Sequence, residues 1–85
     1  MAWRIRFSAA VDKSFGKLDA QVRRRLLEYL ETHVAPDPRR AGKAMKGDER
    51  AWRYRVGSYR IVCDIDDANR TVYVVRVGHR SSVYD

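Results

Sequence analysis

The sequence predicts an α+β fold in which two N-terminal helices pack on one face of an antiparallel sheet, in the order β-α-α-β-β-β. Apolar and polar residues alternate near the N-terminus and again in three segments after residue 50, which is typical of half-buried strands. Between these segments, apolar residues recur at helical spacing. The 85 residues, 45% of them hydrophobic, are enough for one small core, so we expect residues 1–85 to form a single domain.

The two helices are predicted from their capping residues. Residues 3–8 form the first strand, and Ser8 can then cap a short helix that ends near Gly16. Asp19 can cap a second helix. Pro36 ends that helix, because the residue before a proline disfavours the helical conformation. The short connection between the helices predicts an αα-hairpin.

The second half of the chain predicts three strands. A polar, basic connection precedes them and covers residues 36–50. A two-residue turn, Gly57-Ser58, follows the first strand, and the turn sequence DDAN follows the second. The three strands span residues 51–56, 59–65 and 71–78.

Strand parity assigns the side chains of these strands to two faces. Seven residues of the first hairpin share the core face, which packs against the helices: Trp52, Tyr54, Val56, Tyr59, Ile61, Cys63 and Ile65. A three-residue turn at 68–70 adds Tyr73, Val75 and Val77 to the core face. The opposite, open face then carries Arg53, Arg55, Arg60, Arg76, Val62 and Val74.

Two of these arginines are predicted to face each other. A two-residue turn puts Arg55 directly opposite Arg60, and like charges across a strand pair destabilise it. Surface arginines paired with Asp64 or Asp66 are the purely structural alternative, but the same face offers too few acids near Arg55. The sequence therefore predicts a functional cluster of arginines on the first hairpin.

The charge balance indicates what this cluster binds. The net charge is +7 and the isoelectric point about 10.1, which predicts a polyanion or an acidic protein as partner. Arginines outnumber lysines by 14 to 4. The guanidinium group binds phosphate bidentately and stacks on bases, which favours RNA or DNA.

Other classes of protein are disfavoured. No run of 18 or more apolar residues predicts a membrane span, and the N-terminus lacks the apolar core of a signal peptide. The single cysteine, Cys63, lies within an apolar strand and is expected to be buried and inert. We expect a cytoplasmic protein that binds no membrane and has neither a metal site nor a cofactor.

The C-terminal segment and the basic connection supply further candidates. Histidine is the residue type that suits acid–base chemistry near neutral pH, which makes His79 a candidate, and Tyr84 could stack on an RNA base. Six residues are candidates for a site that could stabilise a pentavalent phosphorane, bind nucleic acid without chemistry, or receive the acidic segment of a partner protein: Arg53, Arg55, Arg60, His79, Arg80 and Tyr84. The predicted RNA-binding residues are Lys43, Lys46, Arg50 and Arg76.

Two motifs of the second half resemble the RelE group of the RelE/ParE toxin superfamily. They are the hairpin AWRYRVGSYRIV, with its arginines on either side of a Gly turn, and the terminal VGHRSSVYD. The first half, FSAAVDKSFGKLDAQVRRRLLEYL, is similar to the strand and two helices of that group. The resemblance covers essentially the whole chain.

The resemblance implies a toxin that cleaves mRNA in the ribosomal A site without a metal. In such enzymes the 2′-hydroxyl attacks the adjacent phosphate and leaves a 2′,3′-cyclic phosphate. It also implies a toxin–antitoxin hetero-oligomer with an acidic, RelB-like antitoxin. Carried over by position, Arg60 matches the phosphate-binding arginine, Arg80 a basic residue near the leaving oxygen, and Tyr84 the base-stacking tyrosine.

The general base departs from the family pattern. Some relatives have lysines where this chain has Arg53 and Arg55, and an arginine stays protonated. His79 is the better titratable candidate if the C-terminal segment folds back over the arginines. Otherwise the arginines act only by charge and position.

Two other functions remain open from the sequence. ParE-type members share the fold but poison DNA gyrase by binding it, with no RNA chemistry. A plain nucleic-acid-binding module would bind with a steep salt dependence and cleave nothing.

Overall fold

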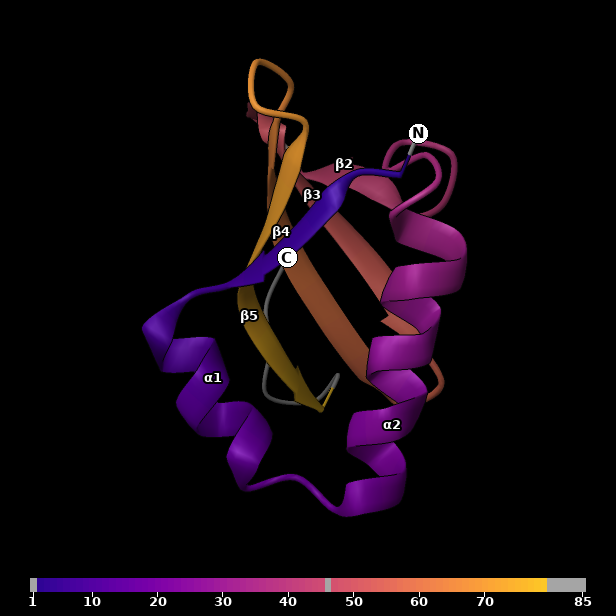
Figure 1. The fold of residues 1–85 in the computed structure, drawn as a ribbon, viewed down its shortest axis with the longest axis vertical. Coiled ribbons are helices and arrows are strands. Elements are labelled where there is room, and N and C mark those ends of the chain that lie inside the picture. The colour runs from indigo at the N-terminus through magenta and orange to yellow at the C-terminus, as the bar shows by residue number, and fades with distance from the viewer. Residues whose placement is uncertain (1, 46, 80–85) are drawn as a thin grey trace.

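A five-stranded sheet forms the centre of the molecule (Figure 1). The structure, a computed structural model, describes residues 2–45 and 47–79. The strands lie in the spatial order β1 (Arg4–Phe7), β5 (Thr71–His79), β4 (Tyr59–Asp66), β3 (Asp48–Val56) and β2 (Lys43–Met45). The predicted antiparallel arrangement holds for every pair except β1 and β5, which run parallel. The predicted connection at 36–50 contains β2 and the start of β3.

Both helices cover the same face of the sheet, as predicted (Figure 1). Helix α1 spans Ala9–Gly16 and α2 spans Ala20–Tyr29. The hydroxyl of Ser8 accepts a hydrogen bond from the Val11 N–H at 3.2 Å. The carboxylate of Asp19 accepts one from the Gln21 N–H at 3.0 Å. Both predicted caps are therefore confirmed.

The second helix does not end where its α-helical hydrogen bonding ends. A π-helical segment, η1 (Leu30–Val34), continues α2, and the Ala35 N–H donates to the Leu30 carbonyl at 2.8 Å. The helix therefore stops just before Pro36, as the proline predicts. The additional residue per turn in η1 has no signal in the sequence that we can identify.

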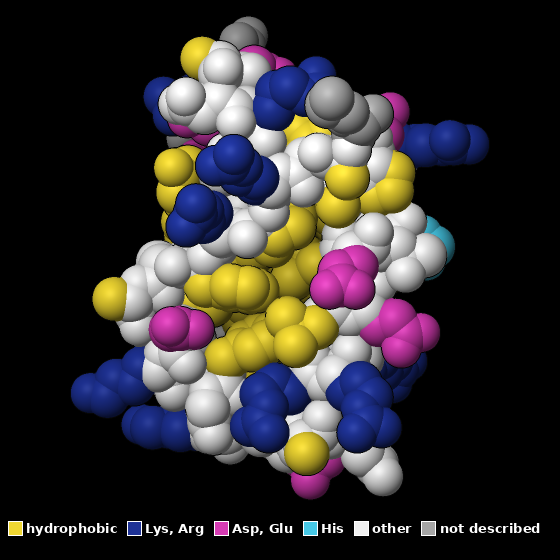
Figure 2. Space-filling view, viewed as in Figure 1, with side chains coloured by type: hydrophobic (Ala, Val, Ile, Leu, Met, Phe, Trp, Pro, Cys, Tyr) yellow, Lys and Arg dark blue, Asp and Glu magenta, His cyan; other side chains and the backbone are white. Residues whose placement is uncertain are grey.

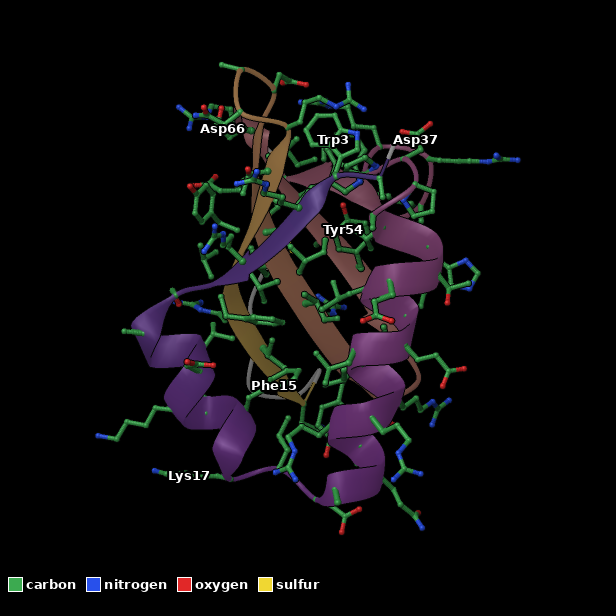
Figure 3. All side chains as sticks on the ribbon, viewed as in Figure 1. Trp3, Phe15, Lys17, Asp37, Tyr54 and Asp66 are labelled. Carbon is green, nitrogen blue, oxygen red and sulfur yellow. The ribbon has the colours of Figure 1, made fainter. Side chains whose placement is uncertain are left out.

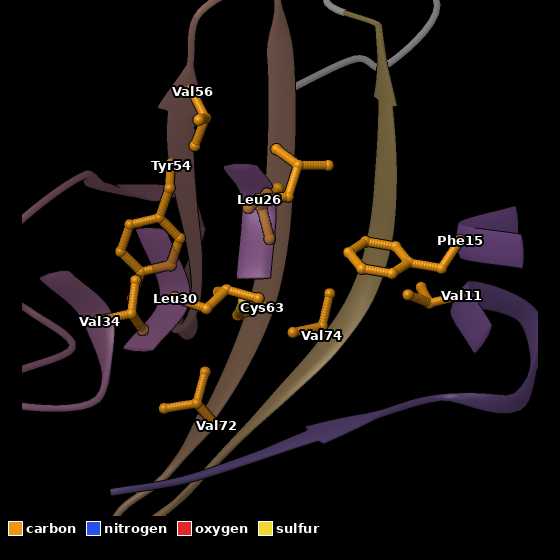
Figure 4. Packing of buried hydrophobic residues seen from close by; sticks show 11 residues of the cluster. Val11, Phe15, Leu26, Leu30, Val34, Tyr54, Val56, Cys63, Val72 and Val74 are labelled. Carbon is orange, nitrogen blue, oxygen red and sulfur yellow. The ribbon is translucent and has the colours of Figure 1, made fainter. Parts of the chain in front are cut away.

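The core lies between the helices and the sheet (Figure 4). Side chains of α1 and α2 meet alternate residues of β3, β4 and β5 there. Cys63 is fully buried, and burial raises the pKa of its thiol, so the thiol remains protonated and inert. The buried cluster comprises Val11, Phe15, Leu26, Leu30, Val34, Tyr54, Val56, Ile61, Cys63, Val72 and Val74.

The turn between β4 and β5 corrects the predicted faces of β5. Asp66 pairs with Thr71, so four residues connect the strands instead of three. Compared with a three-residue turn, a four-residue turn moves every side chain of the following strand to the other face of the sheet. Val74 is therefore fully buried, whereas Tyr73 and Val75, predicted in the core, are each 41% exposed.

A β-bulge then restores the predicted face of Arg76. Cys63 pairs with Val74, but the adjacent Val62 pairs with Arg76, so Val75 is an additional residue in β5. Val62 lies on the open face as predicted, although it is only 8% exposed. Arg76 and Val77 thus lie on the faces assigned to them, through a bulge and not through an odd-length turn.

The helix-covered face carries apolar side chains at its surface. Figure 2 shows them gathered between α1 and α2, with charged side chains around them.

Among the described residues, no helix has the length and apolar character needed to cross a membrane.

Tyr54 connects β3 to the segment that follows the helices (Figure 3). Its ring is 1% exposed, and its hydroxyl donates a hydrogen bond of 2.6 Å to the carbonyl of Pro38. Burial raises the pKa of this hydroxyl, so it remains a donor across the physiological range.

We expect Tyr54→Phe to lower the free energy of unfolding by about 1–2 kcal/mol, because it leaves a buried carbonyl without its donor. Urea denaturation measures the change, provided that the dependence of the unfolding free energy on urea concentration is the same in both proteins. Tyr73→Phe, which alters an exposed tyrosine, is the matched control and should change nothing. Equal stability of Tyr54→Phe and the unaltered protein would contradict the importance of this hydrogen bond.

Candidate functional site

The hairpin of β3 and β4 turns at Gly57 and Ser58, as predicted. Val56 pairs with Tyr59 across the two-residue loop. Gly57 has φ +60°, whereas Ser58 has a negative φ. A left-handed residue at the first central position is the requirement of a type II′ turn, which glycine meets without strain.

The predicted pairing of arginines is confirmed. Arg55 lies directly opposite Arg60, a position at which Cβ atoms are about 4.5–5.5 Å apart. Arg53 pairs with Val62, which in turn pairs with Arg76. The register therefore places these four arginines on the open face of the sheet.

A groove of about 340 Å³ brings four basic side chains together at the edge of β3. We call it the arginine groove. Its described lining contains no acidic residue. Lys43 reaches it because β2 pairs with β3 at Arg53, which places this part of the basic connection beside the hairpin. The arginine groove is lined by Tyr29, Gly42, Lys43, Arg53, Tyr54, Arg55 and Arg60.

Two lining residues were not singled out by sequence reasoning. Tyr29 lies on the apolar side of α2 and is partly buried against the core, yet it also lines the arginine groove. The ring of Tyr29 lies 6.2 Å from that of Tyr54, edge-on, and burial raises the pKa of its hydroxyl. Gly42 has φ +71°, and its backbone lies close to Arg53 and Tyr54.

A second groove, of about 560 Å³, adjoins the arginine groove along the hairpin. It lies between α2 and the end of β3, and Arg55 and Tyr29 line both grooves. Arg24 and Arg25 of α2 add two more basic side chains, opposite Arg55. The two grooves together give this edge of the protein a strongly basic character.

Other predicted residues lie apart from the arginine groove. His79 pairs with Tyr59, on the helix-covered side of the sheet, and their rings meet edge-on at 5.6 Å. The residue opposite Arg60 on β5 is Gly78. Arg50 lies near the other end of β3. Hydrogen bonds from Asn69 lower the pKa of Asp66, a hydrogen bond from Arg39 lowers the pKa of Asp67, and the charge of Arg50 lowers both further. Lys46, Arg80 and Tyr84 lie outside the described residues.

The arrangement suits the binding of a phosphate group. Guanidinium groups present paired N–H donors that match phosphate oxygens, and lysine adds a point charge. Cations fixed around a phosphate also stabilise charge that develops on it during a reaction. Among the side chains that the structure describes, no group of three or more His, Cys, Asp or Glu residues is close enough to hold a metal ion.

Known proteins are similar in sequence to this chain along most of its length. The family model described as the ParE toxin of type II toxin–antitoxin systems matches residues 5–84. Toxin RelG of Mycobacterium tuberculosis is 28% identical over 85 residues, covering 99% of this chain and 98% of RelG. Toxin RelE of the same organism is 25% identical over 83 residues, covering 96% of this chain and 86% of RelE.

Solved structures share the fold. The RelBE2 toxin–antitoxin complex of M. tuberculosis contains a chain that superposes with a TM-score of 0.85 at 27% identity, covering 94% of this chain and 100% of that one. The intact RelBE complex of E. coli gives a TM-score of 0.81 at 30% identity, covering 92% of this chain and 96% of that one. The sequence match, the shared fold and the arginine hairpin together show that the chain belongs to the RelE/ParE superfamily of type II toxin–antitoxin toxins and is of RelE type.

Proposed function

We propose that this toxin is a ribosome-dependent endoribonuclease that cleaves mRNA in the A site and so inhibits translation. The observation that carries the proposal is the arginine groove, in which Arg53, Arg55, Arg60 and Lys43 line one space of about 340 Å³. A fold does not place two arginines directly opposite each other for stability. Their similarity in position to the basic residues of the RelE group supports a role in chemistry.

In the proposed reaction, the 2′-hydroxyl of one nucleotide attacks the adjacent phosphate. The pentavalent phosphorane carries more charge than the phosphodiester, and Arg55 and Arg60 stabilise it more strongly than the ground state. The 2′-hydroxyl gives up its proton to solvent, and the leaving oxygen takes one up from solvent and becomes a 5′-hydroxyl. The cyclic phosphate stays on the upstream fragment. Arg80 assists the leaving oxygen and Tyr84 stacks on a base, as the family pattern implies.

The arginines of this site act by charge and position, because a guanidinium does not lose its proton in a protein. If His79 served as the base, removing it would lower the cleavage rate by about 10²–10⁴-fold. Its pairing with Tyr59, on the other side of the sheet, supports a smaller role.

We expect His79→Ala to retain a cleavage rate within about threefold of the unaltered toxin, well below the effect of losing a base. Single-turnover cleavage on programmed ribosomes measures the rate. His79→Gln, which keeps a polar side chain, is the matched control. A loss of a hundredfold or more in both variants would assign the base to His79 and contradict this expectation.

We further propose that an acidic, RelB-like antitoxin binds the toxin in the cytoplasm as a hetero-oligomer. The related chains occur in complexes with RelB antitoxins, which supports such a partner. The groove beside α2 offers Arg24, Arg25 and Arg55 to an acidic segment.

Poisoning of DNA gyrase is the second candidate function, because the matching family model is described as ParE. A gyrase-binding protein has no chemical need for arginines clustered in one groove. A third candidate, an RNA-binding module, would bind RNA and leave it intact.

Pulse labelling in cells that produce the toxin distinguishes the first two functions. We expect protein synthesis to stop within minutes while chromosomal DNA remains intact. DNA breaks with continued protein synthesis would support gyrase poisoning and overturn the proposal.

A further inference from the structure

A third groove lies on the sheet beyond the arginine groove, beside β1 and β5. It has a volume of about 820 Å³, and its lining includes Arg4, Arg6, Arg70 and Tyr73. We call it the β1–β5 groove. Neither the proposed reaction nor the antitoxin proposal uses it.

The β1–β5 groove opens on the same face of the sheet as the catalytic arginines. Arg6 pairs with Tyr73 across β1 and β5, while Ile5 and Phe7 turn toward the core. On β5, the open face runs from Thr71 at this groove to Gly78 opposite Arg60. The seven steps from Thr71 to Gly78 span roughly 23 Å, so one extended ligand can reach both ends.

The chemistry of the β1–β5 groove differs from that of a plain basic surface. Arg4 and Arg6 are exposed, and neither forms an ion pair with any residue in the described part of the chain. They lie two residues apart on β1, about 6.6 Å along the strand. Tyr73 lies beside them and is 41% exposed, and its backbone is fixed because it belongs to β5.

This combination fits a single-stranded nucleic acid. Guanidinium groups bind successive phosphates, and an exposed tyrosine ring offers a surface on which a base stacks. An acidic peptide would use the arginines but would gain little from the ring.

We propose that the β1–β5 groove is a second RNA-binding site, which holds nucleotides of the substrate strand that flank the cleaved phosphate. Arg4 and Arg6 bind phosphates there, and Tyr73 stacks on a base. The proposal goes beyond the cleavage reaction and concerns binding alone. It rests on the proposed function only in naming the substrate strand as the ligand.

Fluorescence anisotropy with labelled 2′-O-methyl RNA tests this site. Such RNA has no free 2′-hydroxyl, so binding can be measured even if the protein cleaves nothing. Two probes are used, of about 4 and about 12 nucleotides, which bracket the usual length of a single-strand site. The double variant R4Q/R6Q is compared with K13Q/K17Q, which removes the same charge from α1.

For the longer probe, we expect R4Q/R6Q to reduce the slope of log affinity against log salt by about 1.4, as expected for two lost phosphate contacts. Tyr73→Val, which keeps a strand-forming residue, should weaken binding of the longer probe about tenfold. The α1 control should show neither effect, and the shorter probe, which cannot reach both grooves at once, should show a smaller one. Unchanged melting temperatures of all the variants exclude misfolding.

Several outcomes would overturn the proposal. One is equal behaviour of R4Q/R6Q and K13Q/K17Q, and another is a failure of the unaltered protein to bind the longer probe at low salt. A loss of affinity only for a glutamate-rich peptide would instead assign the β1–β5 groove to an acidic protein segment. Each result is independent of whether cleavage occurs, which the production of new RNA 5′ ends reports separately.

Discussion

Arg60→Ala is expected to lower the rate of mRNA cleavage on the ribosome by about 10²–10³-fold, the usual effect of removing one group that stabilises developing charge. Arg60 lines the arginine groove from the central strand β4, where its position is held by strands on both sides. The fold should survive the change, because Arg60 lies on the open face and not in the core. Removing its charge also relieves its repulsion with Arg55.

Cleavage is best measured in single turnover, with circular dichroism and a melting curve on the same sample. Lys13→Ala, which removes a positive charge from α1, is the control and should cleave as the unaltered toxin does. If Arg60→Ala unfolds the protein, the assignment of Arg60 to the open face is wrong. If it folds and cleaves normally, the assignment of the phosphate to Arg60 is wrong.

Gly42→Ala is expected to destabilise the protein by about 2–4 kcal/mol, through backbone strain and overpacking together. At φ +71° a residue with a side chain is strained. The added Cβ would also overlap the carbonyl oxygen of Arg53 and lie 2.7 Å from Cδ1 of Tyr54. Since both neighbours belong to β3, the edge that carries Lys43 and Arg53 would have to move.

Gly16→Ala provides the matched control. Gly16 is the last residue of α1, and a Cβ there would meet nothing within 4 Å. Alanine at this position should leave stability unchanged or raise it by up to about 1 kcal/mol. Denaturant titration of both variants measures the contrast. Equal stabilities would mean that the close approach at Gly42 is not a constraint.

Local sequence signals were enough to predict the elements that position the site. The caps at Ser8 and Asp19 and the stop before Pro36 depend on neighbouring residues only, and all three are confirmed. The hairpin depends on a two-residue turn whose length sets the register. The facing pair Arg55 and Arg60 could therefore be derived from the sequence.

Long-range pairing could not be derived in the same way. The parallel contact of β1 with β5 joins segments more than sixty residues apart, and no local pattern encodes it. The four-residue turn and the bulge at Val75 each change parity by one. Their effects cancel at Arg76, so its face was predicted correctly while those of Tyr73 and Val74 were not.

The site shows the same division. The residues within the hairpin, and Lys43 beside it, come together in the arginine groove. Tyr29 lines the groove from α2, because the helix packs on the sheet there, and that contact is a feature of the tertiary structure and not of composition. His79 misses it by one position of register, since Gly78 lies opposite Arg60. Because neighbouring residues of a strand face opposite sides of the sheet, this shift of one residue puts the histidine on the face opposite the arginines.

Mapping RNA 5′ ends in a purified translation system with one defined mRNA tests the central claim most directly. The toxin is added with and without ribosomes, and primer extension locates each cut. We predict cuts within the A-site codon that require ribosomes and disappear with Arg60→Ala. Intact mRNA together with normal protein synthesis would contradict the claim that the arginine groove cleaves RNA.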